Sequence, residues 1–529
     1  MGSTSVKESS ERDPVTGPLG FSSVADADPH RVAITEIGGR SITYRELAGR
    51  VGRLSNLLRD LGLTPGDCAA ALLPNRREYH ELRLATGQTS LYFAPINHHL
   101  TAREIAHIVV DSEAKVLFVD ESLADTAREV LLGIDFASER LIVIGDSARA
   151  DYERRLASFP THYDGPLLAG EYMGYTSGTT GQPKGVRKRL TGKPPVLAPS
   201  VVAYMARLGI HPGREVHLVT GPLSHAAPGT YSTLALQLGH TVVISERPTA
   251  EEILRLIEAH AVTVTFTVPT VMGRMLALPE EVRSSYDTSS LKCLLHAGAP
   301  CPPDLKRRLI EWLGPVVMEF YGATEGSATA LTATEWLTKP GSVGYAIPGG
   351  EIRILDESGM PLGPREIGTV YFRPATPFEY FKAPEKTRAV HRDGLATAGD
   401  LGHVDEDGWL FLADRREDLI VSGGVNVYPA EVEAVLLESP LVADVAVVGL
   451  PDDDWGHRVA AVVQAEPHVP TDDALADSLV EHCRARLAGF KIPRQIEFVQ
   501  TLPRNSTGKL LRRHIREQHA DGHNKRSAP

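Results

Sequence analysis

Short apolar runs alternate with segments of helical periodicity along much of this 529-residue chain, and this alternation constrains its fold most strongly. Within residues 41–63, apolar side chains recur every three to four positions and end at Gly62, which predicts a helix. A second helix is predicted at 102–111. Buried strands are predicted at 68–73, 115–119, 141–145, 216–220, 241–245 and 262–268, with a helix at 251–260. This order predicts an α/β domain whose sheets are largely parallel.

The pattern of predicted strands, helices and turns changes after about residue 350 and again after about residue 418. Short strands separated by Gly, Pro and Asp turns predict a smaller β subdomain, with strands at 351–355, 368–373 and 409–412. The last part predicts a compact α+β unit of roughly 100 residues. Its helices are expected at 429–438 and 473–487, and its strands at 445–449, 459–464 and 496–499.

Composition excludes several classes of protein. The chain is too long for one core, so two or more domains are expected. A net charge of −12 argues against non-specific nucleic-acid binding, which needs a basic patch. We find neither a signal peptide in residues 1–20 nor an apolar run long enough for a membrane span. Four cysteines without CxxC spacing predict reduced thiols in a cytoplasmic protein: Cys68, Cys293, Cys301 and Cys483.

Residues 174–186 place four glycines, four aliphatic hydroxyls and Lys184 in thirteen positions. Glycines let backbone N–H groups turn inward and bind anions, hydroxyls donate to phosphate oxygens, and the lysine adds positive charge. The spacing is not that of a Walker A loop. The pattern predicts a loop that closes over a polyphosphate. The alternative is a flexible surface linker, but linkers are repetitive and lack the fixed Pro-Lys-Gly end.

The run Tyr-Thr-Ser-Gly-Thr-Thr-Gly-Gln-Pro-Lys-Gly-Val at 175–186 resembles the signature loop of the adenylate-forming superfamily. Its members are acyl-CoA synthetases, peptide-synthetase adenylation domains and beetle luciferases. The resemblance covers roughly residues 21–515, and the later motifs follow in family order. It implies that the leaving phosphates are bound by Thr176, Ser177, Gly178, Thr179, Thr180 and Lys184.

Two further glycine-centred segments, 296–300 and 321–326, follow strand-like runs. We expect both at the carboxyl ends of sheet strands, where open α/β sheets bind ligands. The resemblance places Gly298, Ala299 and Pro300 against adenine, Tyr321 with Gly322 on the base, Thr324 at the α-phosphate and Glu325 on Mg²⁺. Magnesium takes carboxylate and phosphate oxygens, which suits Glu325. Without the resemblance, each segment would be an ordinary turn.

Segments 396–402 and 414–420 supply a carboxylate and a guanidinium, which can bind ribose hydroxyls and phosphate. The resemblance gives these roles to Asp400 and Arg415; the alternative is a surface ion pair. It makes Glu417 the swivel of an interdomain hinge, although glutamate is less usual there. It also assigns Gly423 and Gly424 to the pantetheine tunnel, with a plain strand-end turn as the alternative.

Lys509 stands in a Pro-Arg-x-x-x-Gly-Lys pattern, which the resemblance assigns to the lysine that enters the site for adenylation. A mobile positive charge can offset the repulsion between a carboxylate and a nucleotide polyanion. His225 matches the family position near the substrate carboxylate, although a lone histidine is usually structural. Its small neighbours predict a bulky or long, even polycyclic, acyl group: Ala226, Ala227, Gly229 and Thr230.

Together, these features predict a large N-terminal domain of stacked α/β sheets with a β subdomain, and a small mobile α+β C-terminal domain. The boundaries expected are a tail at 1–20, the ATP- and acyl-binding domain at 21–413, a hinge at 414–418, the mobile domain at 419–515 and a tail at 516–529.

The function implied is an acyl-CoA synthetase of fatty-acid, polyketide or terpenoid metabolism, an ATP-dependent acid–thiol ligase using Mg²⁺ and CoA, as a monomer or homodimer. The catalytic residues implied are His225, Thr324, Glu325 and Lys509.

Three alternatives remain open. A free-standing enzyme could load a carrier protein, although the 75 residues from Glu325 to Asp400 leave little room for the insertion typical of fatty acyl-AMP ligases. A luciferase-like oxygenase would emit light with a luciferin. A catalytically inactive nucleotide sensor would tend to lose Lys509 or Glu325, and both are present.

Overall fold

The computed structural model describes residues 18–176, 183–415, 418–422, 425–452, 455–505 and 508–520. One seven-stranded sheet has the order β20-β8-β7-β4-β3-β5-β6. Its five strands from β7 to β6 are parallel, and β8 and β20 add antiparallel strands at one edge. The bounds are β3 Cys68–Leu72, β4 Tyr92–Ile96, β5 Ala114–Asp120, β6 Leu141–Ile144, β7 Glu171–Thr176, β8 Lys184–Lys188 and β20 Phe378–Tyr380.

The second seven-stranded sheet has the order β13-β12-β11-β9-β10-β1-β2 and is parallel except for β2. An N-terminal strand, β1, therefore completes a sheet made mostly of residues 216–319. The bounds are β1 Val32–Glu36, β2 Ser41–Thr43, β9 Val216–Val219, β10 Thr241–Ile244, β11 Val264–Thr267, β12 Cys293–His296 and β13 Val317–Glu319. The prediction of largely parallel sheets is confirmed.

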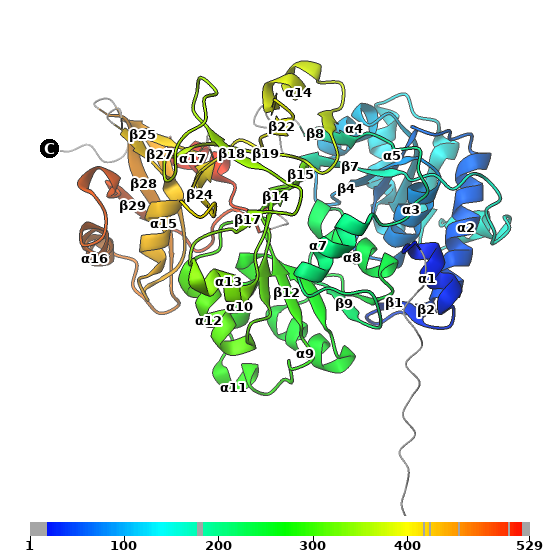
Figure 1. Ribbon diagram of the computed structural model, residues 1–529, viewed down its shortest axis with the longest axis horizontal. Coiled ribbons are helices and arrows are strands. Elements are labelled where there is room, and N and C mark those ends of the chain that lie inside the picture. Colours follow the sequence, from blue (N-terminus) through cyan, green and yellow to red (C-terminus); the bar gives the residue numbers. More distant parts are fainter. Residues whose placement is uncertain are drawn as a thin grey trace, which may run out of the picture.

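The largest core cluster joins both sheets through helices α2, α3 and α8, which pack between them (Figure 1). Phe93 of β4, Leu82 of α3, Leu236 of α8 and Ile244 of β10 all belong to it. The helices of this part are α1 Phe21–Ala27, α2 Tyr44–Asp60, α3 Arg77–Gln88, α4 Ala102–Asp111, α5 Ala124–Leu132, α6 Tyr152–Ala157, α7 Pro199–Arg207, α8 Ala226–Gln237, α9 Ala250–His260, α10 Pro269–Leu276, α11 Glu280–Arg283, α12 Pro303–Leu313, α13 Ala333–Thr338 and α14 Pro384–Val390.

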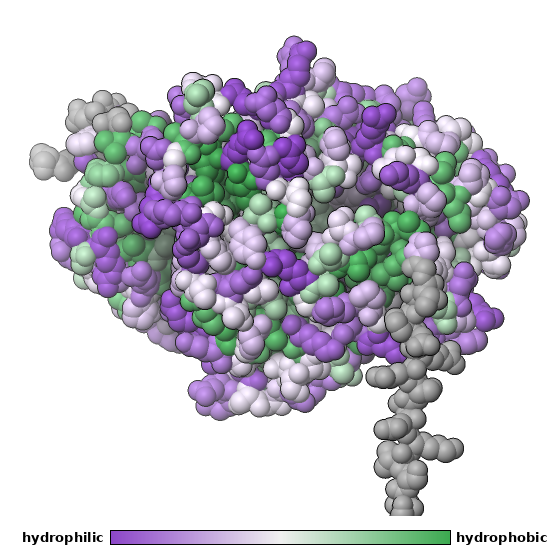
Figure 2. Space-filling view, viewed as in Figure 1, coloured by the Kyte–Doolittle hydropathy of each residue, from purple (hydrophilic) through white to green (hydrophobic). Residues whose placement is uncertain are grey.

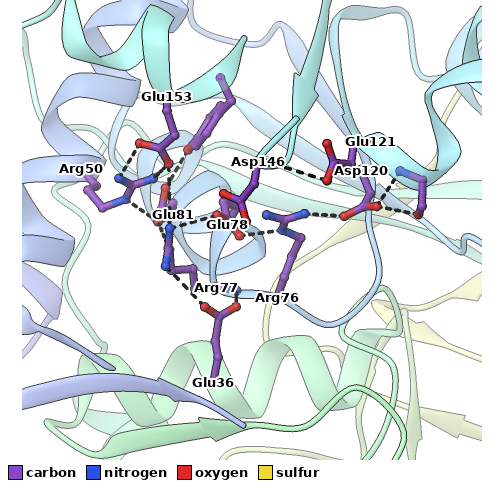
Figure 3. Close-up of polar contacts among 12 residues, drawn as sticks. Glu36, Arg50, Arg76, Arg77, Glu78, Glu81, Asp120, Glu121, Asp146 and Glu153 are labelled. Carbon is purple, nitrogen blue, oxygen red and sulfur yellow. Dashed lines mark hydrogen bonds and ion pairs between the residues drawn. The ribbon is translucent and has the colours of Figure 1, made fainter. Parts of the chain in front are cut away.

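An ion-pair network fixes the first turns of α3 (Figure 3). Arg50 of α2 contacts Glu81 with Nε 2.6 Å from Oε1, and the Tyr152 hydroxyl donates to Glu81 Oε2 at 2.7 Å. Arg76, just before α3, pairs with Glu78 and with the carboxylate at the end of β5. Because buried carboxylates are stable only when paired, this network sets where the rest of α3 lies.

An antiparallel β subdomain follows, as expected from the texture of the sequence. Its sheet has the order β21-β22-β19-β23-β24, with β18 paired to β19. The bounds are β18 Ile352–Leu355, β19 Gly368–Phe372, β21 His391–Arg392, β22 Leu395–Ala396, β23 Asp400–Val404 and β24 Leu410–Arg415. Two short ladders precede it: β14 Gly322–Ala323 with β15 Gly326–Ser327, and β16 Thr329–Ala330 with β17 Tyr345–Ala346.

The C-terminal unit, orange to red in Figure 1, has its own core of apolar side chains from its strands and helices. Its elements are β25 Ile420–Ser422, β26 Val425–Val427, α15 Pro429–Leu437, β27 Val442–Asp452, β28 Gly456–Ala465, α16 Asp473–Arg484, β29 Gln495–Phe498 and α17 Arg512–Ala520. Helix α17 packs its fully buried Ile515 against β27 and β28. The tail expected from residue 516 is therefore wrong for its first five residues, which continue this helix.

Hydrophilic and hydrophobic residues are interspersed over the face in Figure 2. No helix within the described ranges is long and apolar enough to cross a membrane. The four cysteines are unpaired, and three of them are buried.

Candidate functional site

Two of the glycine-centred segments begin side by side, as predicted. His296 ends β12, Glu319 ends β13, and these residues are partners in the parallel register. Segments 297–300 and 320–325 therefore leave the same carboxyl edge of the sheet, where open α/β sheets bind ligands. Gly298 has a φ of +87°, a conformation in which a side chain would be strained.

Segments 321–326 and 396–402 meet at a buried hydrogen bond. The Tyr321 hydroxyl donates to Asp400 Oδ2 at 2.7 Å, and both residues are 8% exposed. Across β23 and β24, Asp400 pairs in register with Arg415. The structure thus brings the aromatic residue, the aspartate and the backbone of the arginine together from positions 321, 400 and 415; the side chain of Arg415 is outside the described part.

The signature hairpin closes on the same site. Lys184 Nζ lies 5.3 Å from the centroid of the Tyr380 ring, and the Tyr380 hydroxyl donates to Glu325 Oε1 at 2.8 Å. A Cβ on Gly174 would lie 2.8 Å from Thr324 Cγ2, so β7 also contacts Thr324. Lys184, Thr324 and Glu325 therefore converge. The side chain of Thr176 and residues Ser177, Gly178, Thr179 and Thr180 fall outside the described residues.

Glu325 is suited to hold Mg²⁺. The residue is only 5% exposed, and its carboxylate accepts a hydrogen bond from Tyr380, whose ring lies 5.3 Å from Lys184 Nζ. In the described part of the chain, no three His, Cys, Asp or Glu side chains group to bind a metal ion. A single carboxylate is nevertheless sufficient for magnesium, because this ion commonly combines one or two carboxylates with substrate phosphates and water.

The loop that carries Lys509 lies near the segment at 297–300. Thr270 Oγ1, in the first turn of α10, donates to the Gly508 carbonyl at 3.3 Å, and a Cβ on Gly508 would contact both Thr270 and Val268. Val268 also lies 3.8 Å from the Cβ position of Gly298. The Lys509 backbone N–H donates to Asn505 Oδ1 at 2.9 Å, which helps to hold the loop. The C-terminal unit therefore presents the Lys509 loop to the site.

A buried ion pair that we did not predict lies at the strand ends from which segments 297–300 and 320–325 leave the sheet. Lys306 of α12 is completely buried, with Nζ 2.6 Å from Glu319 Oε2 and 5.1 Å from the Trp336 ring centroid. Burial raises the pKa of Glu319, while Lys306 lowers it in opposition. Burial and the charge of Lys306 together hold the pKa of His296 well below its usual value. Glu319 and His296 end the strands that lead into these segments.

His225 is the N-cap residue of α8, so the positive end of the helix dipole adjoins it. Next to it, the Ser224 carbonyl accepts a hydrogen bond from the Tyr172 hydroxyl at 3.1 Å, which links α8 to β7. Burial lowers the pKa of His225 to about 4, and the charges of His99 and His98 act in the same direction. His225 is therefore neutral at pH 7.

The space beside α8 differs from our expectation at one residue. A Cβ on Gly229 would lie 2.1 Å from the Tyr79 hydroxyl oxygen and 2.5 Å from the Leu223 carbonyl oxygen. Gly229 is thus small because Tyr79 packs against it, and it leaves no open space for an acyl group. Ala226 and Ala227 stand in the first turn of the helix and are partly exposed.

The depressed pKa of His225 predicts how stability depends on pH. An unfolded histidine binds a proton below about pH 6.5, whereas the folded residue binds one only below about 4. Unfolding therefore takes up a proton between these values, and stability falls as the pH is lowered from about 6.5. We measure the free energy of unfolding by urea denaturation at about pH 7 and about pH 5. Between these two values, we expect it to fall by about 1–2 kcal/mol less in His225→Asn than in the unmodified protein. An identical loss in both proteins would contradict the assignment.

Glu417, Gly423 and Gly424, expected at the hinge and the pantetheine tunnel, lie outside the described residues. Tyr380, which links Lys184 to Glu325, belongs to no motif that we recognised in the sequence.

Comparison with known proteins adds to this geometry. The family model described as AMP-binding enzyme matches residues 21–379, and that of the AMP-binding enzyme C-terminal domain matches residues 431–509. A feruloyl-CoA synthase from an Amycolatopsis species is 36% identical over 502 residues, covering 93% of this chain and 97% of the relative. A fatty acid–[acyl-carrier-protein] ligase from Streptomyces coeruleorubidus is 32% identical over 491 residues, covering 91% and 92%. The crystal structure of ATP-bound MatB from Rhodopseudomonas palustris has a TM-score of 0.83 and 29% identity, covering 95% of this chain and 99% of that one.

Proposed function

This chain belongs to the AMP-binding enzyme family of the adenylate-forming superfamily, and we infer from its site that it is an AMP-forming acid–CoA ligase. It activates a carboxylic acid with ATP as an acyl-AMP and transfers the acyl group to coenzyme A. The observation that carries this inference is the convergence of Lys184, Glu325 and Asp400 at one sheet edge. The Lys509 loop lies beside that edge.

In the first reaction, a carboxylate oxygen of the acid attacks the α-phosphorus of ATP. The bond between the α-phosphorus and the oxygen that bridges to the β-phosphate breaks, and pyrophosphate is released. Lys184 and the hydroxyls of the signature loop bind the leaving phosphates, and Thr324 contacts the α-phosphate. Glu325 would hold Mg²⁺, which supplies positive charge to the phosphates when bound. Lys509 stabilises the charge that builds at the reacting phosphorus.

The other nucleotide contacts follow from the same placement. Gly298, Ala299, Pro300 and Gly322 border the adenine, and the Tyr321 ring packs on it. Asp400 and Arg415 hold the ribose. The hydrogen bond from Tyr321 to Asp400 supports this division because it fixes the ring and the carboxylate relative to each other.

In the second reaction, the sulfur of CoA attacks the acyl carbonyl carbon, and AMP leaves with the electrons of the acyl–oxygen bond. We propose that the C-terminal unit first rotates about Glu417, which withdraws Lys509 and brings Gly423 and Gly424 to the pantetheine path. The contact between Thr270 and Gly508 supports this proposal, because it holds the Lys509 loop beside the segment at 297–300.

The acid itself is bulky or long in this proposal, with its carboxylate near His225 and its body beside Ala226 and Ala227. The names of the two relatives support this, since one refers to feruloyl-CoA and the other to a fatty acid. Because His225 is neutral at pH 7, it can donate a hydrogen bond to the carboxylate without pairing with it as a cation.

A screen of acids for release of pyrophosphate and AMP, run with and without CoA, tests the function. We expect release that requires an acid and ATP, thioester formation with CoA, and a preference for aromatic or long-chain acids over acetate. A carrier-protein ligase would instead form a thioester on a carrier protein and leave CoA unused. This is the alternative suggested by the name of the Streptomyces relative. The proposal would be overturned if none of the acids tested caused release of pyrophosphate.

A further inference from the structure

Arg83 is a partly buried cation that lacks an ionic partner among the described residues. It lies on α3, with Cζ 5.7 Å from the ring centroid of Tyr172 on β7. Its Nε is fully buried and makes no hydrogen bond within the described part of the chain. The carboxylates nearest on its own helix, Glu78 and Glu81, are already paired with Arg76 and Arg50 (Figure 3).

Lys188 brings a second positive charge to the same region. Side chains alternate along a strand, so Lys188 shares a face of β8 with Lys184 and Val186. Val186 is in register with Gly174 of β7, which places Tyr172 on that face too. Burial lowers the pKa of Lys188; the charge of Arg83 lowers it further, and the charges of Glu171 and Glu325 oppose this. Among the described residues, the Lys188 ammonium group has neither a salt bridge nor a hydrogen bond.

Tyr172 connects these cations to the reacting end of the site. A Cβ on Gly174 would lie 2.4 Å from Tyr172 Cε1 and 2.8 Å from Thr324 Cγ2, so the ring lies next to the α-phosphate residue. The Tyr172 hydroxyl donates to the Ser224 carbonyl, one residue before His225. A substrate with its carboxyl group at Thr324 and His225 would therefore extend along Tyr172 toward Arg83.

Arg83 also lines a cavity of about 160 Å³ between α1, α3, α8 and residues 195–196. None of its lining residues is acidic, and four of its polar side chains can donate hydrogen bonds into it: Ser22, Arg83, Thr230 and Gln237. The hydroxyls of Tyr79 and Ser224, near the start of α8, are buried and have no hydrogen-bond partner in the described residues. A purely apolar acyl tail would leave such groups unsatisfied, and that arrangement is unfavourable.

We propose that the acyl site ends in a cationic subsite, made by Arg83 with Lys188, that binds a second carboxylate on the acid. The buried Nε of Arg83 has no partner among the described residues, and Glu171 and Glu325 only partly offset the effects of burial and of Arg83 on Lys188, so an anionic substrate group would compensate both cations. This inference rests on the proposed ligase function and specifies its substrate class as dicarboxylic acids. One carboxyl group reacts with ATP, and the other remains as a carboxylate at Arg83.

Matched pairs of acids test the subsite. Each α,ω-dicarboxylic acid from butanedioic to dodecanedioic acid is compared with the monocarboxylic acid of equal length, and kcat/KM is measured by pyrophosphate release with CoA. We expect at least one diacid to be favoured over its monoacid by about 10-fold or more. Arg83→Met should lower kcat/KM for that diacid by about 10- to 100-fold and change the monoacid by less than about threefold. Arg83→Lys should recover part of the diacid activity.

Two controls separate the possible failures. Arg154→Met removes an exposed arginine on α6 and should leave both substrates unchanged. Lys188→Met should shift selectivity in the same direction as Arg83→Met. If monoacids are activated but no diacid is preferred, or if Arg83→Met lowers both substrates equally, the subsite is refuted while the ligase function stands. If no acid releases pyrophosphate, the proposed function itself fails.

Discussion

Replacing Lys509 by alanine is expected to slow acyl-AMP formation by about 10²- to 10³-fold, the usual cost of losing one charge or donor aimed at the transition state. Its loop reaches the site through Gly508, whose carbonyl accepts a hydrogen bond from Thr270. In the proposed first reaction, Lys509 supplies the positive charge that offsets the repulsion between the attacking carboxylate and the nucleotide polyanion. The rate of acid-dependent pyrophosphate release measures this first reaction.

The second reaction gives the sharper control. Thioester formation from chemically prepared acyl-AMP and CoA should change by less than about threefold in Lys509→Ala, because Lys509 has left the site by then. Arg513→Ala, a charge removed from the exposed face of α17, should affect neither reaction. Equal losses in both reactions would assign Lys509 to folding or to general nucleotide binding.

Replacing Lys306 by methionine is expected to destabilise the N-terminal domain by about 3–5 kcal/mol, because Glu319 would remain buried without its partner. Lys306→Met combined with Glu319→Leu should recover most of that stability. Two apolar side chains of similar volume can be buried without the cost of removing charges from water. Urea denaturation followed by tryptophan fluorescence would measure both, with Trp336 as a nearby probe.

An exposed lysine provides the comparison. Lys292 pairs with Glu215 at 2.8 Å, but its side chain is 59% exposed. Lys292→Met should therefore cost less than about 1 kcal/mol. A double Lys306/Glu319 variant as unstable as Lys306→Met alone would show that the site depends on the specific pair, and would reject the simple desolvation argument.

Strands and helices with strong periodicity were predictable from the sequence, and short elements next to motifs were not. The structure matches the predicted helix at 102–111 and places α9 within one residue of the expected helix at 251–260. Strands β7 and β8 were missed because glycines and hydroxyls there resemble a loop, although tertiary pairing makes both strands. Strand β27 extends from Val442 to Asp452, longer than its apolar centre, because it pairs with β28 through Pro451.

The site was predictable as a set of motifs but not as a set of contacts. The hydrogen bond between Tyr321 and Asp400 and that between Tyr380 and Glu325 join residues far apart in sequence, so no local pattern reports them. Lys306 did carry a local signal. It stands three and four positions before Leu309 and Ile310, the buried face of α12, and a lysine on that face needs an anionic partner.

The ionic anchoring of α3 has an evolutionary consequence. Its first turns are tied by Glu78 and Glu81, whereas its last turns, from Arg83 onward, border the cavity. Mutations in the last turns of α3 can therefore change substrate preference, while the ion pairs of its first turns keep the helix in place. Diversification among descendants of such an enzyme should concentrate in that half-helix.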